Sequence, residues 1–433
     1  MKQLYIETYG CQMNFADSEV VASILSKSCQ LCQTAQEADI ILLNTCSIRE
    51  NAEQRVLKRL EELRALRKKG RPVKIGLIGC MASRFQPDWI AQNLVDCIAG
   101  PDAYRFLPEM LAEEEAPQIH TELSTTETYS GIDPMRYQSN GISAFVSIMR
   151  GCNNFCSYCV VPYTRGRERS RHPEDILREI RNLSEQGYKE VTLLGQNVNS
   201  YLWENSYSFP KLMADVAGTA PQMRIRFTTS HPKDLSDELL ETMAACPNIC
   251  KNIHLPAQSG STEVLQRMNR KYTRESYLER VESLRRILPE ATLSTDLISG
   301  FCGETQQDHE ATLSLMREAR FDYAFMFKYS ERSGTFAARH LKDDVPDNVK
   351  TERLEEVIAL QRTLSDESHR RDIGKTFEVL VEGASKRSEE HLFGRNSQNK
   401  VIVFPKEDAL PGQYANVIVK NCTTATLLGE ITR

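Results

Sequence analysis

The sequence has little that would suit a membrane, a fibre or a disordered chain. Its 433 residues are 40% hydrophobic and 26% charged, with a mean hydropathy of -0.44. Neither internal repeats nor low-complexity tracts interrupt it. This composition excludes a membrane-spanning, collagen-like or disordered protein, and the length predicts about three globular domains.

An excess of positive charge is also missing. The formal net charge of -5 and a pI near 6.0 argue against a protein that coats nucleic acid through bulk charge, so any RNA contact must be local. Residues 111–141 carry six acidic side chains against one arginine, so the net charge of this segment is as large as that of the whole chain, -5. We predict a solvated linker there.

The N-terminus, from Met1 to Cys11, lacks an apolar signal core after a basic start. We therefore expect a cytoplasmic protein in a reducing compartment. In that compartment its 13 cysteines are expected to hold metal or do redox chemistry rather than form disulfides.

The order of apolar runs predicts three domains joined by that linker. In residues 1–110 the runs Leu4–Thr8, Asp39–Asn44 and Val73–Ile78 alternate with amphipathic stretches, which predicts an open parallel α/β sheet. Residues 142–372 contain candidate strands at 143–149, 190–195, 223–229, 251–255, 292–298 and 322–328, and a trailing helix at 347–367. Six βα units predict a partial TIM-like (βα)6 barrel with chemistry at the carboxyl ends of its strands. Residues 373–433 are β-rich and predict a small β-barrel.

The strongest motif is the compact loop that holds Cys152, Cys156 and Cys159 directly after the first predicted barrel strand. Three thiolates at this spacing can hold three irons of a [4Fe-4S] cluster and leave the fourth iron open to a small molecule. A zinc site is the alternative, but zinc prefers four closed ligands, and no nearby His or Cys completes the set.

A second set of cysteines follows the strands of the predicted N-terminal sheet. Cys11, Cys46 and Cys80 each lie one to three residues beyond a predicted strand, at spacings of about one βαβ unit. Because parallel strands end along one edge of a sheet, the three thiols can converge on a metal or cluster. Buried packing is the alternative for cysteines of this kind. The remaining cysteines are interpreted as core or incidental residues, and Cys29 and Cys32 form an isolated pair.

The Cys152 loop resembles that of the radical S-adenosylmethionine family, whose fold is a partial βα barrel with this loop after strand one. Both triads in one chain, followed by a β-rich tail, resemble the methylthiotransferases from end to end. The stretches 156–171 and 194–201 are similar to the branch that acts on tRNA, and residues 195–199, Gly-Gln-Asn-Val-Asn, are the main discriminator. Stretches 227–232, 254–260 and 329–335 also match the family.

Two places depart from the family pattern. Cys302 stands where the family usually has proline, and Glu331, Ser333 and Phe336 replace prolines in the loop after strand six. None of them is a predicted cluster ligand, so the departures concern loop geometry rather than chemistry.

The resemblance implies methylthiolation of carbon 2 of N6-isopentenyladenosine beside the anticodon of tRNA. S-adenosylmethionine would be both methyl donor and source of a 5′-deoxyadenosyl radical. Of two [4Fe-4S] clusters, the one on Cys152, Cys156 and Cys159 would generate the radical, and the auxiliary one on the N-terminal triad would present sulfur. Implied partners are a tRNA anticodon stem-loop, a low-potential electron donor and a sulfur source. We expect a monomer without membrane contact.

Five other side chains are expected near the cofactor. Tyr158 lies inside the first loop, while Gln196, Asn197, His254 and Gln258 end barrel strands, where cofactor contacts gather. Simple packing stays open for Tyr158 and His254, and a turn cap for Asn197.

Local positive charge follows the first loop at alternate positions: Arg165, Arg167, Arg169 and Arg171. Arginine suits bidentate phosphate contacts, so we predict that these four side chains bind RNA, with a solvated surface run as the alternative. In the tail, the segments holding Lys386, Arg387 and Arg395 resemble the TRAM domain, a small RNA-binding β-barrel.

Three rival interpretations remain. A methylthiotransferase acting on an aspartate of a ribosomal protein would share both triads and the tail. A non-catalytic RNA-binding protein would use its cysteines for structural metal. A thioredoxin-like oxidoreductase built on Cys29 and Cys32 would leave both triads unexplained.

Overall fold

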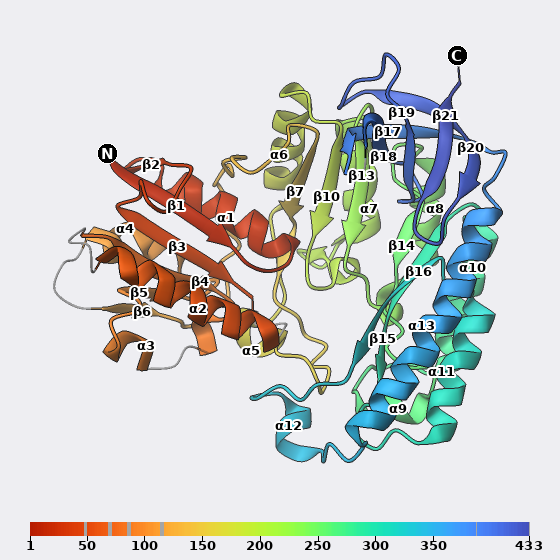
Figure 1. The fold of residues 1–433 in the computed structure, drawn as a ribbon, viewed down its shortest axis with the longest axis horizontal. Helices are drawn as coiled ribbons and strands as arrows, with labels where there is room; N and C mark the ends of the chain where they lie inside the picture. The colour runs from red at the N-terminus through yellow and green to blue at the C-terminus, as the bar shows by residue number, and fades with distance from the viewer. Residues whose placement is uncertain (47–49, 68–71, 85–87, 113–116, 387, 433) are drawn as a thin grey trace.

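The N-terminal domain is a six-stranded parallel sheet in the order β2-β1-β3-β4-β5-β6 (Figure 1). The computed structural model describes residues 1–46, 50–67, 72–84, 88–112, 117–386 and 388–432. The strands are β1 (Lys2–Thr8), β2 (Cys29–Leu31), β3 (Ile40–Thr45), β4 (Lys74–Gly79), β5 (Cys97–Ala99) and β6 (Gln118–His120). The predicted open parallel α/β sheet is confirmed, and its three expected strands are β1, β3 and β4.

Helices cover both faces of this sheet, as parallel sheets require. They are α1 (Gln12–Leu25), α2 (Glu50–Arg67), α3 (Asp88–Ala91) and α4 (Leu107–Ala112), with short 3-10 turns η1 (Ala82–Arg84) and η2 (Tyr104–Phe106). One face packs on α1 and α4, and the other packs on α2 through Val56, Leu60 and Leu63. The spacing of these three residues puts them on one side of the helix. Both faces of β3 are therefore buried.

The segment 111–141, predicted as a solvated linker, is mostly exposed or half-buried in its described part, which excludes 113–116, but some of its residues join the folded domains. Residues 118–120 form β6 at the edge of the sheet, and Tyr129 is buried. Arg136 is ion-paired with Glu19 and Glu179, so it joins the N-terminal domain to the barrel. The segment's acidic composition hid these contacts because its buried residues are few and scattered.

The central domain places six parallel strands in the order β7, β10, β13, β14, β15 and β16, as the predicted partial barrel requires. The strands are β7 (Ser143–Ser147), β10 (Glu190–Leu194), β13 (Arg224–Thr228), β14 (Asn252–His254), β15 (Thr292–Ser299) and β16 (Tyr323–Lys328). A single bridge between Ile225 and Ile249 links the two three-stranded sheets. In the described chain β7 pairs only with β10 and β16 only with β15, so the barrel stays open on one side.

Helices pack on the outer side of these strands (Figure 1). They are α6 (Pro173–Glu185), α7 (Phe209–Thr219), α8 (Asp237–Ala245), α10 (Arg274–Ile287), α11 (Gln306–Ala319) and the trailing α13 (Asp347–Arg370). The short α9 (Thr262–Arg267) packs instead with Phe301 and Tyr329, which follow β15 and β16. Shorter elements lie in the loops: β8 (Met149–Arg150), α5 (Val161–Arg165), β9 (Arg169–Ser170), η3 (Val198–Ser200), β11 (Leu202–Trp203), β12 (Tyr207–Ser208), η4 (Pro232–Asp234) and α12 (Phe336–His340).

The C-terminal domain is a closed barrel in the order β17-β18-β19-β21-β20, which confirms the predicted small β-barrel. Its strands are β17 (Thr376–Ser385), β18 (Ser388–Arg395), β19 (Val401–Pro405), β20 (Tyr414–Cys422) and β21 (Leu427–Ile431). Arg224 of β13 donates 2.7 Å hydrogen bonds to the carbonyls of Arg395 and Glu378, and Arg226 donates to Asn396 O at 2.8 Å. These contacts fasten the barrel to the central domain.

In the described part of the chain, no helix is both long and apolar enough to span a bilayer.

Candidate functional site

The N-terminal triad lies at the carboxyl edge of the first sheet, as predicted. Cys11 precedes α1, Cys46 follows β3, and Cys80 follows β4. A Cβ on Gly10 would lie 2.7 Å from the Cys46 Cβ, so glycine at this position allows the two loops to meet. The loops thereby bring Cys11 and Cys46 into hydrogen-bond contact.

The electrostatic environment of this triad favours a thiolate. A hydrogen bond from Cys46, helped by the nearby Arg165, lowers the pKa of Cys11 to about 6. Burial raises the pKa of Cys80, but the Arg165 Nε donates a 3.0 Å hydrogen bond to the Cys80 Sγ and opposes that effect. Arg165 comes from the central domain, so the barrel supplies a cation to the N-terminal triad.

The Cys152 loop follows β7 and the short β8, so it comes after the first barrel strand as predicted. Burial raises the pKa of Cys152 to about 11 and that of Cys159 to about 12, and neighbouring cysteine sulfurs add to both shifts. The loop is held by segment 267–270: Ser157 N donates to Met268 O at 2.9 Å, and Asn269 Nδ2 donates to Phe155 O at 2.8 Å.

Arg270 is the cation of this second triad, and nothing in the sequence pattern indicated it. Its side chain is buried, and Nη1 donates to the Cys156 Sγ at 3.2 Å. Nη2 donates to Pro256 O at 3.0 Å, and Nε to the Tyr272 hydroxyl at 3.1 Å. Each triad thus has one buried guanidinium in contact with one of its sulfurs.

These two donor sets fit iron–sulfur clusters. Each supplies three cysteines and a cation that donates to sulfur, the arrangement that stabilises an anionic cluster and tunes its potential. Arg165 Nη1 is buried without a hydrogen-bond partner, so this donor remains available beside Cys80. In the part of the chain that the structure describes, no three His, Cys, Asp or Glu side chains form a site for a single metal ion.

Arg165 belongs to a buried ion-pair network at the seam between the first two domains. Asp17 of α1 is fully buried and accepts hydrogen bonds from Arg150 at 2.7 Å and Arg165 at 2.9 Å. Asp102 accepts from Arg169 at 2.9 Å. Sequence reasoning missed both aspartates, because they lie far from the arginines along the chain.

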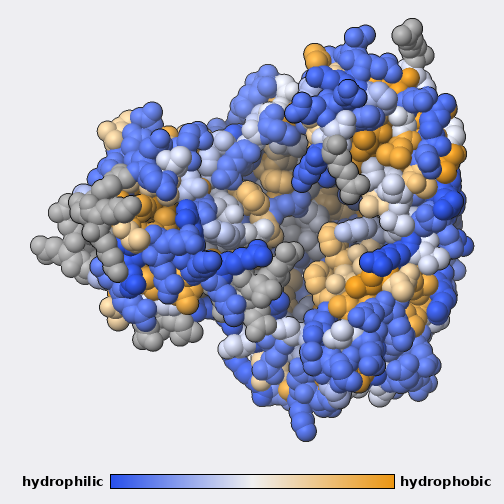
Figure 2. Space-filling view, viewed as in Figure 1, coloured by the Kyte–Doolittle hydropathy of each residue, from blue (hydrophilic) through white to orange (hydrophobic). Residues whose placement is uncertain are grey.

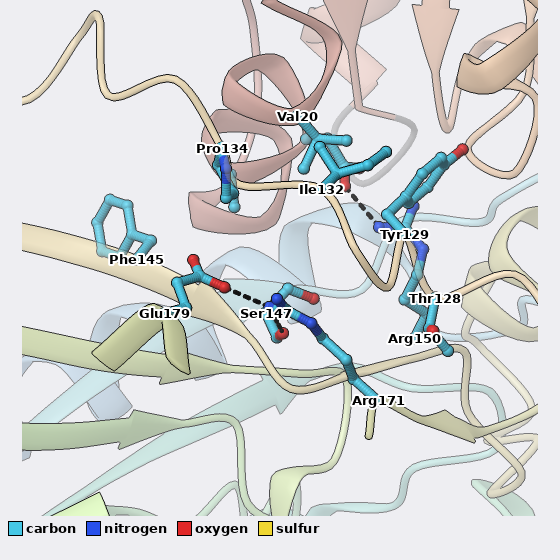
Figure 3. A pocket seen from close by; sticks show the side chains of 12 residues that line it. Val20, Thr128, Tyr129, Ile132, Pro134, Phe145, Ser147, Arg150, Arg171 and Glu179 are labelled. Carbon is cyan, nitrogen blue, oxygen red and sulfur yellow. Dashed lines mark hydrogen bonds and ion pairs between the residues drawn. The ribbon is translucent and has the colours of Figure 1, made fainter. Parts of the chain in front are cut away.

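The seam itself leaves little free space. Figure 3 shows Val20 of α1, Tyr129 and Ile132 above Arg171 and Glu179, which interact directly. The cavity among them holds about 20 Å³, room for about one water molecule. It is therefore packing space and not a substrate pocket.

This burial contradicts the prediction that Arg165, Arg169 and Arg171 bind RNA. Their exposures are 3%, 7% and 5%, and each is ion-paired, Arg171 with Glu179. These three side chains point inward, where acids from other elements meet them. Arg167 is exposed, and its RNA contact stays a prediction.

The predicted RNA contacts of the tail remain untested. Lys386 is exposed. Arg395 pairs with Glu382 at 2.5 Å and is partly exposed. Arg387 lies outside the described residues.

The side chains expected near the cofactor lie at the strand ends. Tyr158 packs edge-on against Phe301, with ring centroids 6.3 Å apart. Gln196 Oε1 accepts from Gly151 N at 2.6 Å and so braces the cysteine loop. Asn197 Nδ2 donates to Asp234 at 2.7 Å, and its side chain makes no cap bond to η3.

His254 and Gln258 flank the same end of the barrel. His254 Nδ1 lies 3.1 Å from Ser294 Oγ, and its Nε2 lies 3.4 Å from Asp296. Gln258 has a φ of +67° and donates its backbone N–H to Asp296 O at 2.8 Å. Cofactor contacts by all five side chains stay predictions.

Comparison with known proteins divides the chain as the geometry does. Residues 3–100 match the model described as Uncharacterized protein family UPF0004, residues 146–316 match the Radical SAM superfamily, and residues 370–432 match the TRAM domain. Among solved structures, the chain is similar to the cobalamin-dependent S-adenosylmethionine radical enzyme OxsB, with a TM-score of 0.57 and 13% identity over 82% of this chain and 56% of that chain. The radical S-adenosylmethionine methyltransferase TsrM from Kitasatospora setae also has a TM-score of 0.57, with 13% identity over 76% of this chain and 75% of that chain. These likenesses show a shared fold.

Curated relatives match over the whole chain. A protein of Phocaeicola vulgatus named tRNA-2-methylthio-N(6)-dimethylallyladenosine synthase is 58% identical over 99% of this chain and 96% of its own length. A protein of the same name from Porphyromonas gingivalis is 57% identical over 99% of this chain and 95% of its own length. The chain belongs to the tRNA-2-methylthio-N(6)-dimethylallyladenosine synthase family of radical S-adenosylmethionine enzymes, which use S-adenosylmethionine and a [4Fe-4S] cluster.

Proposed function

We propose that this protein methylthiolates carbon 2 of N6-isopentenyladenosine beside the anticodon of tRNA. Dimethylallyl and isopentenyl name the same substituent in this nucleoside. The observation that carries the proposal is the pair of cysteine triads, each with its own buried arginine, on two domains that meet at Arg165. The names of the relatives and the TRAM match support tRNA as substrate.

The two triads would hold two [4Fe-4S] clusters, one on Cys152, Cys156 and Cys159 and an auxiliary one on Cys11, Cys46 and Cys80. When bound, these groups and S-adenosylmethionine would supply the radical that removes an unactivated hydrogen and the sulfur and methyl group that replace it. The chemistry belongs to the cofactors, and the protein contributes position, charge and exclusion of water.

The chain's own residues account for that contribution. Arg270 holds the Cys156 sulfur, while Arg165 holds the Cys80 sulfur and also ties the barrel to Asp17 of α1. The Asp17 contact ties the two domains together, and this would hold the two triads in a constant arrangement around the substrate base. Holding reacting groups in a fixed geometry is a large contribution that a protein can make to a reaction between bound groups.

A low-potential electron donor and a sulfur source complete the proposed reaction. We place the protein in the cytoplasm, because reduced cysteines are needed for both triads, and we expect it to act as a monomer.

Mass spectrometry of tRNA nucleosides from a strain lacking this protein tests the function. We expect 2-methylthio-isopentenyladenosine to disappear, isopentenyladenosine to accumulate, and the wild-type chain to reverse both changes. Unchanged 2-methylthio-isopentenyladenosine would refute the proposal, and loss of methylthio-aspartate from a ribosomal protein would instead support the rival substrate.

Iron analysis after anaerobic reconstitution tests the two-cluster assignment. We expect about eight irons per chain, and about half of that after Cys11, Cys46 and Cys80 are all replaced by alanine. Cys246→Ala, outside both triads, is the matched control and should keep the full iron content. Full iron content in the triple variant would overturn the auxiliary site.

A further inference from the structure

A row of rings and guanidinium groups lies beside the Cys152 loop, and all of its members are exposed except the half-buried Phe155. Its members are Phe155, Tyr163 and Arg167 from the loop and α5, and Phe336, Arg339 and His340 from α12, here named the aromatic–arginine surface. Tyr163 is 42% exposed and Phe336 is 47% exposed. Single exposed rings are common on protein surfaces, but rings that gather in one contiguous patch mark an interaction site.

The row is continuous across two separate segments of the chain. The Arg167 guanidinium lies 5.8 Å from the Phe155 ring centroid, and Phe155 meets Tyr163 edge-on at 6.3 Å. Arg339 lies 5.8 Å from the Tyr163 ring and so joins α12 to α5. Within α12, Phe336 stacks on His340 with centroids 4.3 Å apart. Figure 1 shows α5 and α12 next to each other at the lower side of the molecule.

The two arginines of the aromatic–arginine surface have no carboxylate partner in the described part of the chain. In the described residues neither Arg167 nor Arg339 forms an ion pair with a carboxylate, whereas Arg165, Arg169 and Arg171 all do. Glu168, the acid next to Arg167, is occupied by a hydrogen bond from Asn153 N at 3.1 Å. Two free guanidinium groups among exposed rings suit a ligand with phosphates and flat bases.

The location of this surface connects it to both triads. Ala337 N of α12 donates to Ser157 O, between Cys156 and Cys159, at 2.7 Å. Just before α12, Ser333 O accepts from Arg84, four residues after Cys80, at 2.6 Å. Segment 333–337 therefore touches the loop of each triad. Figure 2 shows that the molecule is hollowed between the N-terminal domain and the barrel, with apolar surface beside the hollow.

We propose that the aromatic–arginine surface binds the unpaired anticodon-loop nucleotides that flank the modified base, by stacking on its rings and by phosphate contacts of Arg167 and Arg339. This inference rests on the proposed function and adds the surface that holds the substrate. Single-stranded RNA is recognised by stacking on aromatic and guanidinium planes, in the way this row offers them. An acidic electron-donor protein would be drawn by the two arginines but would leave the row of exposed rings unexplained.

Equilibrium binding of a fluorescent anticodon stem-loop to the reconstituted full chain tests the inference. One stacked base contributes about 1–3 kcal/mol to the binding free energy, so Tyr163→Ala and Phe336→Ala should each raise the Kd about 5-fold or more. Tyr163→Phe keeps the ring and should restore binding. The control is Phe106→Ala: Phe106 is also 47% exposed and stacked on a histidine, His120, but it lies in the N-terminal domain. This control should bind as the wild type does.

The double variant Arg167→Gln with Arg339→Gln gives a second readout. Each phosphate contact to single-stranded RNA contributes about 0.7 to the slope of log K against log salt, so the slope should fall by about 1.4. Arg105→Gln, which removes an arginine already paired with Glu127, should leave the slope unchanged.

The outcomes separate this inference from the function on which it rests. If the wild type modifies tRNA but the ring and arginine variants bind the stem-loop with unchanged Kd and salt slope, the surface does not hold RNA and only this inference fails. If those variants keep RNA affinity but lose reduction by an acidic electron carrier, the surface belongs to the donor protein. If the wild type neither binds nor modifies tRNA, the proposed function fails.

Discussion

Replacement of Asp17 by asparagine is the sharpest test of how the two triads are held together. The carboxylate is fully buried and is the shared acceptor of Arg150 and Arg165. Asparagine keeps the size of the side chain but removes its charge. Arg150 would then keep Asp102, at 3.7 Å, the Pro101 carbonyl and the face of the Tyr129 ring, while Arg165 would keep the Cys80 sulfur.

The magnitude follows from the burial of this network. Removing one partner of a buried ion pair costs about 3–5 kcal/mol, because the remaining charge stays buried and uncompensated. The Tm of a domain of about 150–250 residues falls by about 2–4 °C for each kcal/mol lost from the free energy of unfolding, and that of a smaller domain falls further. Asp17→Asn should therefore lower the first unfolding midpoint by about 6 °C or more. The matched control is Asp175→Asn, which removes a surface pair with the 45%-exposed Arg178 and should cost at most about 1 kcal/mol.

Differential scanning calorimetry of both variants measures this difference. Separate transitions are expected for separate domains, so each midpoint is compared with its wild-type counterpart. If the two variants shifted the first midpoint equally, by 2 °C or less (about 1 kcal/mol), Asp17 would not be what fixes the seam, and the argument from Arg165 would fail.

Four further predictions address pH, the first loop, the C-terminal barrel and the Arg270 contact. Burial raises the pKa of Asp17, but the charges of Arg150 and Arg165 outweigh burial and hold the folded pKa below 3.8. The wild type should therefore be more stable than Asp17→Asn above about pH 4, and this difference in stability should vanish as the pH falls through the folded pKa. Denaturation of both proteins at stepped pH measures the difference, and its disappearance near pH 6 would contradict the prediction. A Cβ at Gly151 would lie 2.0 Å from the Arg167 carbonyl oxygen, at a φ of +80°, so Gly151→Ala should distort the first cysteine loop and lose about half of the iron on reconstitution. The control is Gly131→Ala, which has a similar φ of +77° but no neighbour within 4 Å and should keep the full iron content. Arg224→Gln removes two carbonyl contacts to the C-terminal barrel and should speed limited proteolysis near residues 370–376; unchanged cleavage would show that the barrel is fastened elsewhere. Arg270→Gln removes a hydrogen bond to the Cys156 sulfur and should make the reduction potential of that cluster more negative in a redox titration, whereas an unchanged potential would show that the contact does not tune it.

The sequence was sufficient to predict the parts of the fold that follow from local pattern. Apolar runs such as Ile40–Thr45 are buried on both faces and were expected as strands, and the cysteines of both triads follow strands as expected. Short strands at 97–99 and 118–120 were missed because three residues give no periodicity to detect.

The partners of the buried arginines could not be predicted, because they meet only in three dimensions. Asp17 and Arg165 lie 148 residues apart, and Cys156 and Arg270 lie 114 apart. From the sequence alone, arginines at alternate positions 165–171 were interpreted as an RNA-binding stretch. Only their tertiary contacts show that three point into the seam and that Arg167 alone of the four is left at the surface.

In the proposed reaction each triad has its own task, and one assay separates the two tasks. The variant with Cys11, Cys46 and Cys80 replaced by alanine is incubated with reductant, S-adenosylmethionine and tRNA carrying isopentenyladenosine, and 5′-deoxyadenosine and methylthio nucleoside are measured together. We expect 5′-deoxyadenosine without methylthio product, because Cys152, Cys156 and Cys159 remain. Methylthio product at the wild-type yield, or no 5′-deoxyadenosine from a variant that retains about half of the wild-type iron, would contradict it.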